Sequence, residues 1–144
     1  MLGFRFWQKW LFYFGLYLVI FGLALSFFSQ SKLMDIVFNN QIDPEFWGVS
    51  ALPGNTERFQ AWIYGVLGAT ISGWGIFVTF ISHFAFKAKE KWAWNCIFLG
   101  FGLWFIADSA MSIYYGIEFN IIINLAFFIP VLLPLLFTRK YFSK

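Results

Sequence analysis

The sequence predicts an all-α integral membrane protein: an antiparallel bundle of four transmembrane helices with an ordered outer loop between the first two. Three observations predict this class. Hydrophobic residues make up 60% of the 144-residue chain and charged residues 12%, about half the charged share of a soluble domain. Aromatic residues contribute 25%, more apolar surface than so small a domain buries away from water. Four apolar stretches are each long enough to cross a bilayer, and we treat residues 1–144 as a single transmembrane domain.

The composition also excludes several classes of function. The net charge of +3 comes from short basic clusters beside apolar runs, which is not the charge pattern of a protein that binds nucleic acid. Cys96 is the single cysteine and therefore forms no internal disulfide or CxxC redox pair. His83 is the single histidine, which excludes bis-histidine haem ligation and a His-rich metal site. We predict no cofactor and no metal.

The first span is predicted at residues 11–28. Before it, Arg5 and Lys9 alternate with aromatic side chains, which is typical of an anchor at the level of the lipid headgroups. Ala24-Leu25-Ser26 resembles the cleavage site of a signal peptide, but the apolar run is longer than the core of a usual signal. We therefore interpret this stretch as a transmembrane helix.

Residues 29–58 are the one sizeable polar segment and are predicted to form the ordered outer loop. Apolar side chains at helical spacing in Ser31–Asn40 predict a short amphipathic helix on the membrane surface. Asp43 is predicted to be the N-cap of a further turn, with Pro44 at its first helical position and Gly48 at its end.

The second span is predicted at residues 59–81, with Thr56 as its N-cap. Small residues recur at every fourth position and form a ridge: Ala61, Gly65, Ala69 and Gly73. Such a ridge lets helix backbones approach closely in a membrane. It packs either against a neighbouring helix of the same chain or, as the seam of a homo-oligomer, against a second copy.

The third and fourth spans are predicted at residues 92–115 and 120–137. The connections on either side of the third span are short, so the second, third and fourth helices are expected to be antiparallel neighbours. Pro130 and Pro134 lie one turn apart in the fourth span. Prolines in membrane helices free backbone carbonyls and usually kink the helix.

The basic residues predict the orientation of the chain in the membrane. Eight of the ten Lys and Arg residues lie before the first span, between the second and third spans, or after the fourth. The positive-inside rule therefore places both termini in the cytoplasm and the long loop outside. We predict a multi-pass protein of the cell (inner) membrane.

Asp108 is the one acid deep inside an apolar stretch. It lies about eight residues, or roughly 12 Å, from the outer end of its predicted span. A carboxylate in hydrocarbon is costly, so an acid at this depth is a functional-site hypothesis by default. The polar side chains expected near it complete a candidate ligand site: Ser112, Tyr115, Asn124, Tyr64 and, from the rim, Arg58.

This polar group has two interpretations. It is either a structural hydrogen-bond network between helices, or an outward-facing pocket that binds a lipid headgroup or small ligand or relays a proton. No nucleophile–base pair, phosphate loop or cluster of metal ligands indicates catalysis, so we name no catalytic residue.

Several short motifs within about residues 44–140 form a recognisable set. They are Trp62-Ile63-Tyr64-Gly65, Gly73-Trp74-Gly75, Lys91-Trp92-Ala93-Trp94-Asn95, Trp104 with Asp108, and Asn120 with Asn124. Together they resemble those of small uncharacterised four-helix proteins of bacterial inner membranes. The resemblance implies a location and an architecture but no activity, because none is assigned to such proteins.

The leading functional hypothesis is non-enzymatic. It is an accessory or scaffold subunit, surrounded by membrane lipids, that packs against itself or another membrane protein. The alternative is a binder or carrier of a lipid or small hydrophobic ligand that uses Asp108, and the third is a membrane enzyme of unknown reaction. A scaffold should expose small residues to lipid, a carrier should have a cavity reaching Asp108, and an enzyme needs a second titratable or nucleophilic group beside it.

Overall fold

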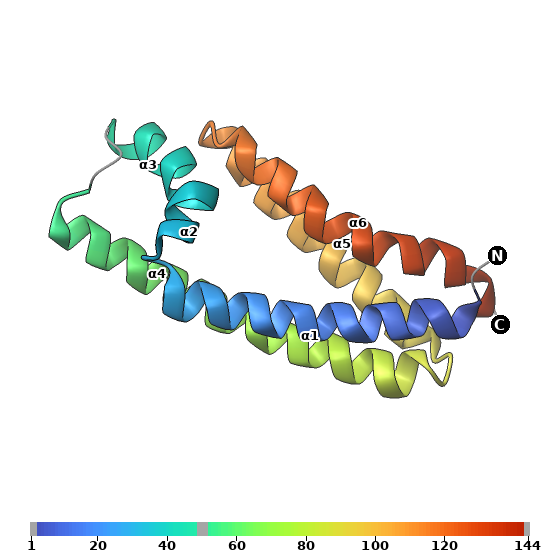
Figure 1. Cartoon of the computed structure of the whole chain (residues 1–144). Coiled ribbons are helices and arrows are strands. Elements are labelled where there is room, and N and C mark those ends of the chain that lie inside the picture. Colours follow the sequence, from blue (N-terminus) through green and yellow to red (C-terminus); the bar gives the residue numbers. More distant parts are fainter. Residues whose placement is uncertain (1–2, 49–51, 143–144) are drawn as a thin grey trace. The chain divides into compact units, whose positions relative to one another are not determined.

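Four long helices dominate the protein (Figure 1). The computed structural model describes residues 3–48 and 52–142, and no strand occurs among them. The long helices are α1 (Phe4–Phe28), α4 (Gly54–Ile81), α5 (Lys91–Tyr114) and α6 (Glu118–Thr138). Each is long and apolar enough to cross a membrane, by length and composition. The predicted all-α class with four helices of spanning length is confirmed.

Some helices begin earlier or continue further than the predicted spans. α1 begins at Phe4, so the basic and aromatic N-terminal segment forms its first two turns. α4 begins at Gly54, and Thr56 lies inside its first turn, so the prediction of Thr56 as N-cap is wrong. A π-helical turn, η2 (Ser82–Phe86), follows α4. Hydropathy locates the apolar part of a helix, whereas backbone hydrogen bonding continues into its polar ends.

The segment between α1 and α4 is largely helical. It consists of α2 (Lys32–Met34), the π-helical turn η1 (Asp35–Asn39) and α3 (Asn40–Trp47). The helix runs through Asp43, so the prediction of this residue as an N-cap is wrong. Gly48 ends α3 with a left-handed φ of 68°, and its N–H donates to the carbonyl of Pro44 at 2.9 Å. Glycine adopts this backbone conformation without steric cost, which suits it to end a helix.

The chain divides into two compact units, which are described separately. The first unit comprises Met1–Tyr17 and Gly75–Lys144, and the second comprises Leu18–Trp74. Each unit contains part of α1 and part of α4. The single domain expected from the sequence stays a prediction.

In the first unit, α5 and α6 form a helical hairpin (Figure 1). Gly116 turns the chain between them with a φ of 75°, and the N–H of Ile117 donates to the carbonyl of Ser112 at 2.8 Å. At the far end of the hairpin, Trp94 Nε1 donates to the carbonyl of Leu135 at 2.9 Å. These contacts show that α5 and α6 run antiparallel.

Trp10 joins α1 to α6 at the proline pair. Pro134 has no N–H, so the carbonyl of Pro130 loses the partner that it would have in a regular helix. Trp10 Nε1 donates to this carbonyl at 2.8 Å. The indole therefore satisfies a backbone group that would otherwise be unpaired in an apolar environment.

In the second unit, α1 and α4 approach each other through glycines. Gly22 and Ser26 lie one turn apart on α1, and Gly68 and Ser72 lie one turn apart on α4. A Cβ atom at Gly22 would lie 2.6 Å from the backbone nitrogen of Ser72, and one at Gly68 would lie 2.7 Å from that of Ser26. Only glycine fits at these two positions without displacing the partner helix. We call these four residues the glycine seam.

The two serines of the glycine seam hydrogen-bond across it. Ser26 Oγ donates to the carbonyl of Gly65 at 3.0 Å, and Ser72 Oγ donates to the carbonyl of Val19 at 3.1 Å. Each hydroxyl thus reaches a carbonyl on the opposite helix, and the pairing shows that these parts of α1 and α4 run antiparallel. Small residues with serine hydroxyls are a common basis for close helix packing in membranes.

The glycine seam differs from the predicted ridge of small residues. A Cβ atom at Gly65 would meet only the carbonyl of Ser26, at 3.9 Å; Ala69 is exposed; and nothing described lies within 4 Å of a Cβ at Gly73. Steps of four residues drift by about 40° each around a helix of 3.6 residues per turn, so a strict four-residue ridge leaves its starting face. The packing role proposed for Ala61, Gly65, Ala69 and Gly73 stays a prediction.

Candidate functional site

Asp108 is the centre of a polar cluster that joins α5 to α6 near the turn of the hairpin. Its Oδ1 atom accepts hydrogen bonds from Asn124 Nδ2 at 2.8 Å, from Asn120 Nδ2 at 2.5 Å and from Ser112 Oγ at 3.3 Å. Asp108 and Ser112 lie one turn apart on α5, as do Asn120 and Asn124 on α6. Spacing of four residues places each pair on one face of its helix, so the two faces meet.

Further hydrogen bonds tie the members of the cluster to one another. Asn120 Nδ2 donates to Ser112 Oγ at 2.9 Å, and Ser112 Oγ donates to the backbone carbonyl of Asp108 at 2.8 Å. Asn124 Nδ2 also contacts Ser109 Oγ at 3.3 Å. Ser112 is 6% exposed and Asn124 is 2% exposed. Buried polar groups are stable in a low dielectric only when they have such partners.

The carboxylate of Asp108 is engaged on one oxygen. Within the part of the chain that the structure describes, its hydrogen bonds reach Oδ1, and the side chain is neither fully buried nor fully exposed. Two amide N–H groups and a hydroxyl converge on that oxygen. Oδ2 is therefore the atom with which this cluster would bind a donor or cation from outside the chain.

The residues predicted around Asp108 fall into three groups. Ser112 and Asn124 donate to its carboxylate. Tyr115 is the C-cap residue of α5, and its side chain is 54% exposed. Arg58 and Tyr64 belong to α4 in the second unit, and their participation in a ligand site stays a prediction.

Asp108 lies closer to its helix end than the sequence suggested. α5 ends at Tyr114, six residues beyond Asp108, which corresponds to about 9 Å along the helix axis. Asn120 and Ser109 were not among the residues predicted for the site. Asn120 precedes Asn124 by four residues and therefore shares its helix face. This spacing could have identified Asn120 as a further residue of the site.

A second polar group lies in the second unit. Asp43 is 3% exposed, and its Oδ1 accepts a hydrogen bond from Gln60 Nε2. Burial raises the pKa of the Asp43 carboxyl above its usual 3.8; the hydrogen bond from Gln60 lowers it, and the nearby charge of Asp35 raises it further. Asn39 Nδ2 donates to Asp35 Oδ1 at 2.8 Å, while Asn39 Oδ1 is buried without a described partner.

Neither polar group has the composition of a metal site. Among residues 3–48 and 52–142, no three His, Cys, Asp or Glu side chains gather where they could hold a metal ion. Comparison with known protein families, with curated proteins and with solved structures finds no match. Function is therefore inferred from the polar groups and from the faces of the helices.

Proposed function

We propose that this protein is a non-enzymatic, four-span membrane protein of the cell (inner) membrane, an accessory or scaffold subunit that packs against itself or another membrane protein. We take the four helices to form an antiparallel bundle with both termini in the cytoplasm. The observation that carries the proposal is that α4 has two small-residue faces. One is filled by α1 in the glycine seam, and the other is open at Ala69 and Gly73.

The open face of α4 suits a further helix. Ala69 is exposed, and no described atom lies within 4 Å of a Cβ at Gly73. Helix association in a membrane has no hydrophobic driving force, so it depends on close packing at small residues. The same helix already packs in this way at Gly68, which supports a similar contact on the other face.

The long helices also leave much apolar surface for lipid or a partner. Of the most apolar 18-residue window of each span, 33% is buried in α1, 28% in α4, 11% in α5 and 28% in α6. α5 therefore has the smallest buried share of the four helices, although one of its faces packs against α6. A protein of this kind suits an assembly in which other helices cover its spans.

The polar cluster supports a structural role for Asp108. Its Oδ1 has three donors, and among the described residues Ser112 is the one whose hydroxyl hydrogen-bonds to it. Ser112 is 6% exposed and donates to a backbone carbonyl at 2.8 Å. A serine nucleophile needs access to a substrate and a base that takes its proton, so the enzymatic hypothesis ranks last.

One observation favours the alternative, a binder or carrier of a small hydrophobic ligand. Asp108 Oδ2 has no hydrogen bond among the described residues, and the side chain is partly exposed. A ligand with a donor or cationic group could pair with this oxygen. Asp108→Asn would then abolish retention of that ligand during purification while the protein stays folded.

The scaffold proposal is tested by purifying the protein from its own membrane into native nanodiscs and determining the assembly by native mass spectrometry. We expect a second copy or another membrane protein to accompany the wild type, and Gly73→Leu to release it. Gly102→Leu is the matched control, because Gly102 on α5 also has nothing described within 4 Å of a Cβ. Wild-type protein that purifies as a monomer without companions, or equal loss in both variants, contradicts the proposal.

The orientation is tested by labelling single cysteines in a Cys96→Ser background. A cysteine at Asn55 should react with a membrane-impermeant reagent added outside the cell, and a cysteine at Ser143 should react after the membrane is opened. Labelling of both positions from one side would contradict the four-span topology.

A further inference from the structure

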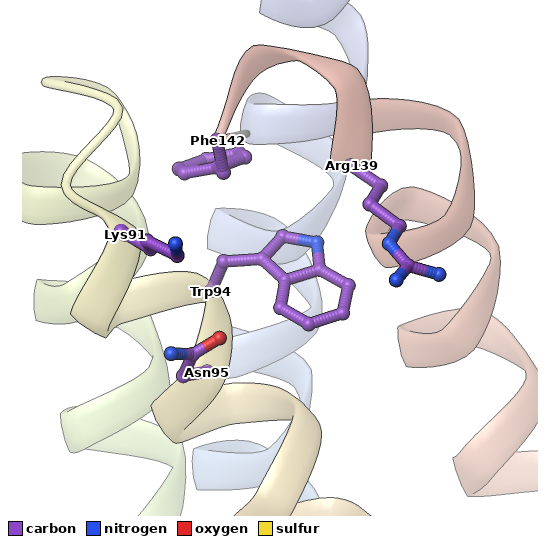
Figure 2. Close-up of a pocket in the computed structure, with 5 residues that line it drawn as sticks. All are labelled: Lys91, Trp94, Asn95, Arg139 and Phe142. Carbon is purple, nitrogen blue, oxygen red and sulfur yellow. The ribbon is translucent and has the colours of Figure 1, made fainter. Parts of the chain in front are cut away.

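We propose that the hollow between the start of α5 and the end of α6 binds a phosphate group, carried by an anionic lipid headgroup or by a soluble phosphate. The hollow has a volume of about 250 Å³. Figure 2 shows the residues that line it: Lys91, Trp94, Asn95, Arg139 and Phe142. All five belong to the first unit, and this proposal does not depend on the scaffold function.

The aromatic walls of the hollow are held in place by their neighbours. Trp94 Nε1 donates to the carbonyl of Leu135 at 2.9 Å, and its ring stacks on Phe98 with centroids 5.0 Å apart. Phe142 is 5% exposed and packs on Phe86 with centroids 4.7 Å apart. A binding site on such walls is preorganised, which lowers the entropy lost on binding.

The polar groups of the hollow suit an anion. Lys91 and Arg139 lie on opposite sides of the Trp94 indole, with the Asn95 amide on a third side (Figure 2). Both cationic side chains are exposed, and the structure gives neither an ion pair nor a hydrogen bond to another described side chain. A guanidinium binds two phosphate oxygens at once, an ammonium adds a point charge, and an amide adds a neutral donor.

The position of the hollow selects phosphate among anions. Lys91 is the first residue of α5, and Arg139 follows the last residue of α6, so both stand where apolar spans end. Lipid phosphates lie at this level of a membrane. Basic pockets between transmembrane helices on the cytoplasmic side are typical sites for anionic headgroups.

The size and the local charge agree with this ligand. A volume of about 250 Å³ corresponds to roughly eight water molecules at ~30 Å³ each, enough for a phosphate and its first ester group. Lys89 and Lys140 contact Tyr141, the residue before Phe142, with their ammonium groups 5.3 Å and 5.2 Å from the centroid of its ring. Their charges raise the local concentration of anions around the hollow.

The test uses the full-length protein in nanodiscs of phosphatidylcholine that contain a small fraction of phosphatidic acid or cardiolipin. Native mass spectrometry measures the anionic lipid retained by the wild type, by a Lys91→Gln, Arg139→Gln double variant and by a Lys32→Gln, Lys87→Gln control. The control removes the same two charges from exposed positions outside the hollow. We expect at least about a tenfold loss of bound anionic lipid in the hollow variant and little change in the control.

A second arm distinguishes the sources of phosphate. Inorganic phosphate is titrated against the wild type and the same variants in phosphatidylcholine alone, and binding is followed by phosphorus NMR line broadening. Loss of lipid retention identifies a lipid headgroup site, whereas loss of phosphate binding without lipid preference identifies a soluble ligand. Equal lipid and phosphate binding in the wild type and the hollow variant, or equal losses in the hollow variant and the control, overturn the proposal.

A single variant covers the case in which the double variant fails to fold. Arg139→Lys keeps the charge but removes the bidentate contact, so it should still weaken binding. Unchanged binding in Arg139→Lys would then contradict the proposal.

Discussion

Two helix pairs in this protein are held together by different interactions. In the second unit, α1 and α4 touch through the glycine seam, where Gly22 faces Gly68. The side-chain hydrogen bonds across the seam come from two serine hydroxyls. In the first unit, α5 and α6 are joined by the carboxylate of Asp108 and the amides of Asn120 and Asn124. The first pair depends on backbone proximity and the second on long polar side chains.

The difference shows that a glycine on a helix does not by itself bring a partner helix close. Gly100 and Gly102 lie on α5, yet nothing described is within 4 Å of a Cβ at either position. The α5–α6 pair is instead joined by the interhelical hydrogen bonds of the polar cluster.

The largest expected effect is at the glycine seam. Gly68→Leu would drive a side chain into Ser26 and the carbonyl of Gly22, and we expect it to lower the free energy of unfolding by about 3 kcal/mol or to prevent folding. Gly73 lies on the open face of the same helix, where nothing described is within 4 Å of a Cβ. Gly73→Leu should therefore leave the free energy of unfolding nearly unchanged. Reversible unfolding in bicelles measures both, and similar costs for the two variants would remove the distinction between the faces of α4.

A smaller effect is expected where Trp10 satisfies the carbonyl freed by Pro134. Trp10→Phe keeps an aromatic ring but removes the Nε1 donor to Pro130, so the unfolding free energy should fall by about 1 kcal/mol. Trp92→Phe is the control, since the Trp92 side chain is exposed and has no described hydrogen bond. If both substitutions cost the same, hydrogen bonding to proline-freed carbonyls does not stabilise this fold.

The smallest effect concerns pH and the second polar group. Because the pKa of Asp43 is raised in the folded protein, the fold binds a proton more tightly than the unfolded chain does. As pH falls through the raised pKa towards 3.8, the Asp43 contribution should therefore make the fold more stable. The measurement is the melting temperature from neutral pH to pH 4, taken as the difference between wild type and Asp43→Asn. If the melting temperature of the wild type instead falls relative to that of Asp43→Asn on acidification, folding stabilises the charged Asp43 carboxylate, which contradicts this prediction.

The sequence predicted these features unequally, for physical reasons. Hydropathy identified the four long helices because a helix of spanning length needs a continuous apolar run. Spacing identified Ser112 as a neighbour of Asp108 within one helix, and it placed Asn124 at a similar depth on the next. The glycine seam was missed because it depends on which face of α4 meets which glycines of α1, and repeated small residues at every fourth position pointed to a different face.

The hollow beside Trp94 was missed for a related reason. Lys91 and Arg139 are 48 residues apart in the sequence and come together only because α5 and α6 form an antiparallel hairpin. Separately, each residue is one more basic side chain at the end of a span, which the positive-inside rule already explains. Only the packing of the hairpin creates a cavity between them.

The most direct measurement is the stability of the Asp108 variants, because the carboxylate of Asp108 joins α5 to α6. Asp108→Asn keeps an acceptor of similar shape, whereas Asp108→Leu removes it. In bicelle unfolding we predict that Asn is nearly neutral and that Leu costs about 1–2 kcal/mol, while Ala107→Leu on the exposed face of the same turn changes little. Wild-type stability in Asp108→Leu, or equal damage from Asn and Leu, would contradict the claim that this carboxylate holds the hairpin together by accepting hydrogen bonds.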